Sequence, residues 1–280
     1  LSSAASDVYK RQMFDRKRRG MWRRRIWLLF SIVFFSQLFL GIFVDSMFLM
    51  SGKLHFPIPG LIPAGVFYRG EVSFRPFLFL VTILLSGGAW CSQLCYFGAW
   101  DSLAAGKNGK REALSSKMRT RMRWTVLFVF IGVASALRGF GIPVIYSTGI
   151  AAFAGIVGIM IIGFMSKRCH VAIHCSSYCP AGTLVMYLKQ VSPWRLRLND
   201  RCRHCMACTR VCRYGALSKV DVLKGRPAIN CTLCGDCLAG CGHDALEYHL
   251  GGISPVLAER LWLGTTLVPV SYTHLTLPTI

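Results

Sequence analysis

Eight cysteines between residues 202 and 241 fall into two groups with the same spacing. The groups are Cys202-x2-Cys205-x2-Cys208-x3-Cys212 and Cys231-x2-Cys234-x2-Cys237-x3-Cys241. With this spacing, three thiolates of a group can wrap one [4Fe-4S] cluster while the fourth reaches across to a second cluster. The predicted ligands are Cys202, Cys205, Cys208 and Cys241 for cluster 1, and Cys212, Cys231, Cys234 and Cys237 for cluster 2. A zinc ion would favour two C-x2-C pairs separated by a longer loop, so zinc is the weaker interpretation.

Four further cysteines form two pairs of equal spacing, which are Cys91-x3-Cys95 and Cys175-x3-Cys179. On a helix, residues four apart point in one direction, so two such pairs could form a four-thiolate redox or metal site. The alternative is that these cysteines are buried, free and packed as small hydrophobic residues. His170 and His174 lie nearby in the sequence, either as further ligands or as interfacial, hydrogen-bonded side chains.

The composition places much of the chain in a membrane. Hydrophobic residues make up 53% of the 280 residues and the mean hydropathy is +0.45, which exceeds what a soluble domain buries. A helix needs about 20 apolar residues to cross the hydrocarbon region. Four stretches of such length are expected to span, namely residues 26–50, 77–100, 124–146 and 148–165. The predicted fold is an α-helical membrane protein of about four spans, followed by a small ferredoxin-like α+β domain with two [4Fe-4S] clusters.

The formal net charge of +21 comes largely from short basic runs beside the apolar stretches. Residues 14–25 and the loop 101–123 are rich in Arg and Lys, whereas residues 51–74 are not. By the positive-inside rule, the N-terminus and the loop 101–123 are cytoplasmic, and so is everything after the fourth span. Both C-x3-C pairs then lie at one membrane face. We interpret the basic runs as determinants of topology, with anionic-lipid binding as the alternative, and expect no nucleic-acid partner.

These patterns divide the chain into segments. Both ends, LSSAASDVYKRQ and VSYTHLTLPTI, resemble translated sequencing artefacts. The predicted segments are an artefact at 1–12, a basic cytoplasmic N-terminus at 13–25, a transmembrane domain at 26–180, a connector at 181–198, the cluster domain at 199–250, the start of a further membrane segment at 251–269, and an artefact at 270–280.

Taken together, the basic start, four spans, two C-x3-C motifs and terminal two-cluster segment resemble the NapH/MauN-type ferredoxin-like membrane proteins. That group is related to the C-terminal half of NosR and to FixG/CcoG, and the resemblance covers about residues 26 to 250. Three positions depart from the pattern, because Tyr96, Arg213 and Gly242 stand where proline is usual. The resemblance implies a multi-pass protein of the bacterial inner membrane that takes electrons from the quinol pool.

The main functional expectation is an electron conduit. A quinol or another membrane donor would be oxidised near the cytoplasmic interface, and two [4Fe-4S] clusters would pass the electrons to a reductase partner. The chain is interpreted as an electron-transfer subunit, with a quinol dehydrogenase as the complex it would serve, and with no catalytic residue of its own. Asp45 could accept a quinol proton or simply lie at the headgroup level. Alternatives are a FixG/CcoG-like assembly or metal-reducing factor, a regulatory redox protein, and an anchor with purely structural clusters.

Overall fold

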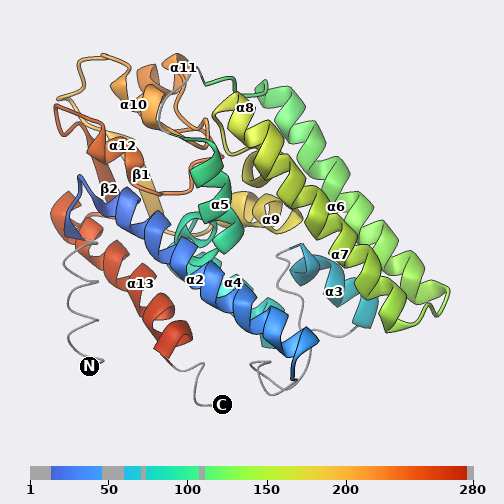
Figure 1. The fold of residues 1–280 in the computed structure, drawn as a ribbon. Coiled ribbons are helices and arrows are strands. Elements are labelled where there is room, and N and C mark those ends of the chain that lie inside the picture. Colours follow the sequence, from blue (N-terminus) through green and yellow to red (C-terminus); the bar gives the residue numbers. More distant parts are fainter. Residues whose placement is uncertain (1–13, 46–59, 71–73, 107–110, 276–280) are drawn as a thin grey trace.

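The computed structural model describes residues 14–45, 60–70, 74–106 and 111–275. The chain is mostly helical, with one small sheet (Figure 1). In chain order, the elements are α2 (Arg19–Phe43), α3 (Leu61–Arg69), α4 (Phe74–Ser86), η2 (Trp90–Leu94), α5 (Tyr96–Ala104), α6 (Ser116–Gly139), α7 (Val144–Met160), η3 (Ile161–Ser166), α8 (Lys167–Cys169), η4 (His174–Tyr178), α9 (Pro180–Leu188), β1 (Trp194–Leu198), α10 (Ala207–Val211), α11 (Lys219–Leu223), α12 (Asp236–Ala239), β2 (Leu246–Leu250) and α13 (Pro255–Leu275). The η elements are short π-helical turns.

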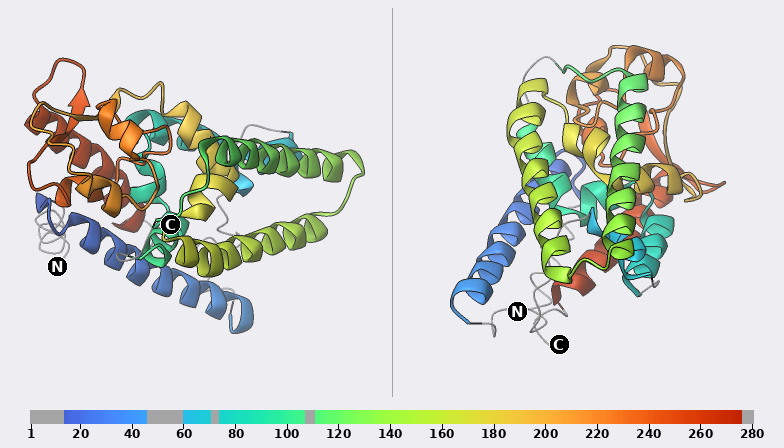
Figure 2. Two further views of the ribbon diagram at one scale, coloured as in Figure 1. Left: turned by 90° about the horizontal axis from the view of Figure 1, so that it is seen from above. Right: turned by 90° about the vertical axis from the view of Figure 1, so that its right-hand side faces the viewer.

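Three helices in the described part of the chain are long and apolar enough to cross a membrane. They are α2, α6 and the continuous run Val144–Cys169, which is built from α7, η3 and α8. All three slope in one direction in Figure 1, and the cysteine-rich domain lies where α2 and α6 begin and α8 ends. Figure 2 shows α6 and α7 joined at residues 140–143, at the opposite end. The predicted first, third and fourth spans are therefore present as helices, although residues 46–50 of the first lie outside the described residues.

The predicted second span, residues 77–100, is not one helix. Its apolar start is α4, which ends at Ser86, and Gly87 follows with a φ of +61°. A side chain is strained in that conformation, so glycine ends the helix there. At Gly88 a Cβ atom would lie 2.8 Å from the carbonyl oxygen of Cys231. The chain turns at these glycines because the cysteine-rich domain passes against it, and η2 and α5 continue as separate short elements.

The cysteine-rich domain is built around a two-stranded antiparallel sheet. Trp194 of β1 pairs with Leu250 of β2, and Leu198 pairs with Leu246. Because side chains alternate along a strand, Trp194 and Leu196 are buried while Arg195 and Arg197, which alternate with them, are exposed.

The short helices α10, α11 and α12 complete the domain. Six of the eight clustered cysteines are buried in its apolar core or pack against that core. The two exceptions are Cys205, which is exposed, and Cys234, which packs with Tyr214 and Cys175.

Helix α13 packs on this sheet along its first turns. Trp262 stacks on Tyr248 of β2 with ring centroids 4.5 Å apart, and Ala258 and Leu263 are also fully buried there. The sequence suggested a further membrane segment beginning within residues 251–269. In the structure this segment begins helix α13, whose first turns pack on the cysteine-rich domain through Ala258, Trp262 and Leu263. The start of a membrane segment here stays a prediction.

The basic runs do more than orient the chain. Arg24 Nη1 lies 3.0 Å from Asp236 Oδ2, and Arg119 Nη1 of α6 donates a 3.2 Å hydrogen bond to the carbonyl oxygen of Gly215. Arg19 is buried against an acidic residue of α13 in the same way. These contacts join α2 and α6 to the domain that follows them. The topological interpretation therefore missed a second use of the same charges, which is to fix the membrane helices to the cysteine-rich domain.

Candidate functional site

The structure places the eight clustered cysteines around two small cavities. We call them the outer cavity and the inner cavity, and their volumes are about 20 and 10 Å³. The cysteines that line the outer cavity are Cys202, Cys205, Cys208 and Cys241. The cysteines that line the inner cavity are Cys212, Cys231, Cys234 and Cys237. These are the two sets that the spacing predicts, including the exchange of the fourth cysteine between the groups.

The backbone around the two cavities repeats itself. His204 and Leu233, each two residues into its group, have φ values of 51° and 54°. Met206 and Gly235, two residues further on, have φ values of 60° and 80°. Left-handed conformations cost non-glycine residues about 1–2 kcal/mol each, so they persist where the surroundings require them. Here they curl each loop so that three thiols face one cavity.

The sulfur atoms also receive matching backbone donors. The amide of Ala216 donates to Cys212 Sγ at 3.2 Å, and the amide of Ala245 donates to Cys241 Sγ at 3.4 Å. Each donor is four residues beyond its cysteine. Such bonds favour the thiolate over the thiol, which is the form that binds metal. The two crossing cysteines are therefore held in the same way at both cavities.

Each cavity has four sulfur donors on its walls, which is the donor set that a [4Fe-4S] cluster takes. Among the described residues, no group of three or more His, Cys, Asp or Glu side chains is arranged to hold a metal ion. Burial raises the pKa of Cys212 to about 12 and that of Cys234 to about 11. Such thiols ionise only beside compensating positive charge, which bound iron would supply.

Buried arginines contact the loop that carries Cys234 and Asp236, beside the inner cavity. Arg23 Nη1 donates a 2.6 Å hydrogen bond to the carbonyl oxygen of Cys234, and Arg213 Nε lies 3.5 Å from Asp236 Oδ2. Burial alone would raise the pKa of Asp236, but Arg23, Arg24 and Arg213 hold it below its ordinary value of 3.8. Three guanidinium groups against one carboxylate leave an excess of buried positive charge. Such an excess is costly unless a further anion lies nearby, and four thiolates with a cluster would be that anion.

The outer cavity is closer to solvent. Cys205 is exposed, and Cys202 and Cys241 are half-buried. Arg203 and His243 line the rim of this cavity. The cysteines of the outer cavity are therefore the more exposed set, because three of the four inner cysteines are buried and Cys231 is half-buried.

The two C-x3-C motifs share one local structure. In each, the segment between the cysteines is a π-helical turn, and the second cysteine has extended backbone, with ψ of 121° at Cys95 and 118° at Cys179. A nine-residue helix then begins, with glycine three residues after the second cysteine. A Cβ on Gly98 would lie 1.8 Å from the carbonyl oxygen of Cys91, so this turn requires glycine. The prediction of two thiols on one continuous helical face is therefore wrong, because each motif ends one helix and begins another.

Two of the four thiols of these motifs pack together. Cys91 and Cys179 lie in one apolar cluster, whereas Cys175 and Cys95 each pack in another. All four cysteines are buried. Burial and, after it, the nearby Cys179 raise the pKa of Cys95 to about 12. The structure brings one cysteine of each motif together, and the four-thiol redox or metal site stays a prediction.

Asp101 positions this thiol site and was missed in the sequence. It is fully buried on α5, and its Oδ2 accepts a 2.7 Å hydrogen bond from the backbone amide of Cys175. An acidic residue beside an apolar stretch could have indicated it, since a buried carboxylate needs such donors. The contact fixes the second motif against the helix that follows the first.

Tyr214 connects the thiol site to the inner cavity and was also missed. Its side chain is 1% exposed and packs with Cys175 on one side and Cys234 on the other. Tyr214 follows Arg213 directly after the crossing cysteine Cys212, and this adjacency is the only sequence signal of its position. A continuous set of contacts therefore leads from the membrane thiols to the inner cavity.

Two other predicted residues have clear places. His174 is buried, its ring stacks on Phe97 with centroids 5.3 Å apart, and neither ring nitrogen has a hydrogen-bond partner among the described residues. His170 takes a left-handed conformation with φ of 53°, so the helix does not continue through both histidines as the shared face would require. Asp45 is exposed just beyond the end of α2, which favours the headgroup level over a role inside the membrane.

A larger pocket of about 510 Å³ opens between α3, α6 and α7. Its walls are mostly apolar, and its polar lining residues are Tyr68, Arg69, Ser147 and Thr148. Ser147 Oγ is buried and has no hydrogen-bond partner among the described residues. The carbonyl oxygen of Ala154, which also lines the pocket, accepts a 3.1 Å hydrogen bond from the hydroxyl of Tyr178. The pocket therefore reaches the second C-x3-C motif through Tyr178.

Comparisons with protein-family models, with curated proteins and with solved structures each found no match to the chain. The chemistry of the site is therefore argued from the chain's own residues.

Proposed function

We propose that this chain is a membrane-bound electron-transfer protein that carries two [4Fe-4S] clusters in its inner and outer cavities. The observation that carries the proposal is that each cavity is lined by four cysteines, one of which comes from the other cysteine group. When bound, each cluster would take up and release one electron at a time. The excess of buried arginine charge beside the inner cavity supports an anionic occupant there.

The arrangement of the two cavities supports transfer across the protein. The inner cavity is in contact with the membrane thiols through Tyr214, and the outer cavity presents Cys205 to solvent. We propose that electrons arrive at the inner side and leave to a soluble or peripheral reductase from the outer side. Most cysteines of the inner cavity are buried away from water, whereas Cys205 of the outer cavity is exposed to it.

For the donor we propose a quinol, bound in the apolar pocket between α3, α6 and α7. A quinol has an apolar tail and two hydroxyl groups, and the pocket combines apolar walls with the unpartnered Ser147 and with Tyr68. The lining stretches, 129–137 of α6 and 144–154 of α7, lie toward the helix ends remote from the cysteine-rich domain. This proposal moves the donor away from the basic membrane face at which the sequence placed it.

The experiment that tests the clusters is iron and sulfide analysis with low-temperature EPR on full-length protein purified without oxygen. We expect about eight irons per chain, since two clusters of four are proposed. Cys234→Ser should lower the iron content by about half, and Cys169→Ser, which changes a cysteine outside both cavities, should leave it unchanged. Zinc in place of iron, or equal effects of the two variants, would overturn the proposal.

The donor is tested by reducing the loaded protein with a quinol analogue. Ala151→Phe fills the pocket from a buried lining position, whereas Ile159→Phe adds the same kind of ring on the exposed side of α7. We expect Ala151→Phe alone to slow reduction by the quinol while reduction by dithionite stays unchanged. Equal rates for both variants would remove the pocket from the proposal but leave the clusters in place.

One observation favours a second function, that of an assembly or metal-reducing factor. Cys91 and Cys179, one from each C-x3-C motif, are buried in one cluster, and thiolates are the ligands that soft metals such as Cu(I) prefer. Replacing Cys91 and Cys179 by serine separates the two functions. Loss of maturation of a metalloenzyme with normal quinol oxidation would favour the assembly factor, and loss of both would favour the thiols as part of the conduit.

A further inference from the structure

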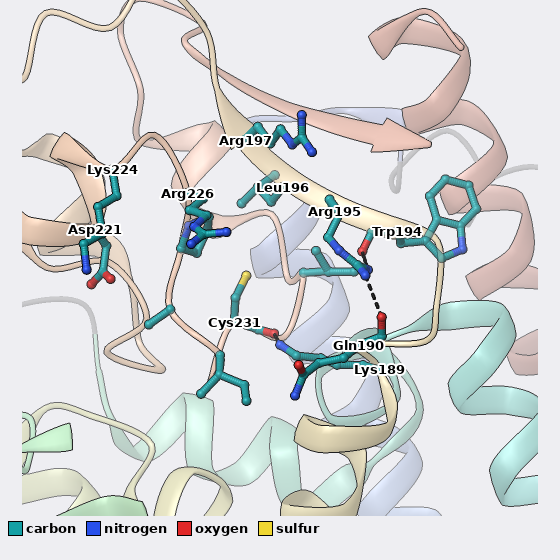
Figure 3. Close-up of a pocket in the computed structure, with 14 residues that line it drawn as sticks. Lys189, Gln190, Trp194, Arg195, Leu196, Arg197, Asp221, Lys224, Arg226 and Cys231 are labelled. Carbon is teal, nitrogen blue, oxygen red and sulfur yellow. Dashed lines mark hydrogen bonds between the residues drawn. The ribbon is translucent and has the colours of Figure 1, made fainter. Parts of the chain in front are cut away.

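A basic cavity of about 570 Å³ lies beside the inner cavity and has no part in the function proposed above (Figure 3). Its walls come from the end of α9, the strand β1, the end of α11 and the loop that leads to Cys231. Small-molecule sites in proteins have volumes of about 300–1,000 Å³, so this cavity has the size of a ligand site. The charged side chains that line it are Lys189, Arg195, Arg197, Lys224, Arg226 and Asp221.

The cationic residues reach the cavity from facing sides. Arg195 and Arg197 are two residues apart on β1 and therefore share its exposed face, while Lys224 and Arg226 come from the opposite wall. In Figure 3 the thiol of Cys231 lies between Arg226 on one side and Arg195 on the other. The backbone holds part of this arrangement, because Arg195 Nη2 donates a 2.7 Å hydrogen bond to the carbonyl oxygen of Gln190.

The charge in this cavity is poorly balanced. Asp221 is the single acidic residue among its lining residues, against five basic ones. The Asp221 carboxylate already accepts hydrogen bonds from the amide and hydroxyl groups of Ser218 in the cap of α11. Converging arginines match the geometry of phosphate oxygens, to which a guanidinium group can bind through two parallel bonds. The unbalanced charge therefore favours a phosphate group as the occupant.

The remaining walls favour more than a bare phosphate ion. Leu196, Ile229 and Leu233 line the cavity together with a proline and an alanine. A ligand with both a phosphate group and a flat apolar ring would use both kinds of wall. An acidic protein would contact the exposed arginines but would leave this apolar interior unfilled. The shape thus favours a small molecule over a protein partner.

We propose that this cavity binds a phosphorylated ligand of about mononucleotide size, with the phosphate between the arginines of β1 and Arg226. The phosphate could belong to a soluble nucleotide or to a phospholipid headgroup, and both present the same group to these residues. Cys231 lines both this cavity and the inner cavity, but the arginines that would hold the phosphate are not among the proposed cluster ligands, so binding can be tested apart from electron transfer.

The test uses the full chain, purified with its metal content intact, and equilibrium dialysis against FMN, riboflavin and ADP. FMN and riboflavin share a ring system and differ in the phosphate. We expect FMN and ADP to bind, and riboflavin to bind at least about tenfold more weakly, a difference of about 1.4 kcal/mol. Equal binding of FMN and riboflavin would overturn the proposal. A failure of FMN, ADP and phosphatidylglycerol alike to bind would also overturn it.

Paired variants locate the site. Arg197→Gln with Arg226→Gln removes two charges from the cavity, and Arg168→Gln with Lys219→Gln removes two exposed charges elsewhere. We expect at least about a tenfold loss of FMN affinity in the first pair and less than about twofold in the second. Equal losses would mean that net charge alone attracts the probe, which would overturn the site. The iron content of each pair shows whether the cysteine loops have stayed intact.

Nanodiscs distinguish the two sources of phosphate. In neutral phosphatidylcholine discs, a soluble ligand site should bind FMN as strongly as in detergent. Displacement of FMN by phosphatidylglycerol would mean that the phosphate comes from a lipid headgroup. Binding of phosphatidylglycerol with the same dependence on Arg197 and Arg226 that is expected for FMN would mean the same. If neither FMN, ADP nor phosphatidylglycerol depends on these two arginines, no phosphorylated ligand uses the cavity.

Discussion

The inner and outer cavities have the same cysteine spacing but different surroundings. At the position two residues after the second cysteine of each group, the inner loop has Asp236 and the outer loop has Ala207. The crossing cysteine of the inner cavity is followed by Arg213 and Tyr214, which are buried, whereas Gly242 and His243 follow that of the outer cavity and are exposed. One repeat has thus been fixed to the membrane domain while the other remains at the surface.

This difference makes the two cavities unequal in burial and charge. The same local backbone can present a site to solvent or join it to a neighbouring domain, depending on a few residues between the cysteines. At the inner cavity these residues add buried charge pairs and a contact to the membrane thiols. At the outer cavity they leave a cysteine exposed. The ligands make the sites alike, and the intervening residues make them unequal.

The strongest way to break the comparison is to remove the carboxylate that only the inner loop has. Asp236→Asn would leave Arg23, Arg24 and Arg213 buried without their anion. We expect a loss of about 3–5 kcal/mol in the free energy of unfolding, as for breaking other buried ion pairs. Urea denaturation of the detergent-solubilised protein measures it.

Asp244→Asn is the control, because Asp244 is exposed and lies 4.0 Å from its basic neighbour. Its effect should stay below about 1 kcal/mol, the usual range for surface pairs. The low pKa of Asp236 also sets a pH window. Its stabilising contribution is present at neutral pH and is lost only as the pH falls through the range below 3.8, where the carboxylate takes up a proton. A similar loss in both variants would mean that the inner charge cluster is not special.

The cysteine sets and the helical membrane class could be predicted because both depend on local patterns. Cluster ligands must follow one another at short spacing, and a span must be apolar over a continuous stretch. The ion pairs could not be predicted, since Arg24 and Asp236 are 212 residues apart in the chain. The break in the predicted second span was missed because Gly87 and Gly88 are tolerated in apolar helices. Only the nearby Cys231 shows why glycine is needed there.

A second, smaller effect should appear in the reduction potentials. Arg23→Gln removes a positive charge next to Cys234, and a reduced cluster carries one more negative charge than an oxidised one. We expect the potential of the inner cluster to fall by about 60 mV, equal to a tenfold change in a one-electron equilibrium. Arg203→Gln, at the rim of the outer cavity, should instead lower the outer potential by less, because solvent screens it. Redox titration followed by EPR resolves the two centres, and equal shifts would contradict the unequal surroundings.

The smallest effect concerns one hydrogen bond that only the inner loop possesses. The hydroxyl of Tyr248 donates a 2.8 Å bond to the carbonyl oxygen of Leu233, the residue with left-handed backbone, whereas the equivalent His204 of the outer loop is exposed. Tyr248→Phe keeps the ring and removes the bond, so it should cost about 1 kcal/mol. If that cost falls on the inner loop, a chelator should remove iron from the inner cavity about fivefold faster, while release from the outer cavity stays unchanged. Equal acceleration at both cavities would show that Tyr248 stabilises the domain as a whole, because a purely global effect cannot distinguish the two loops.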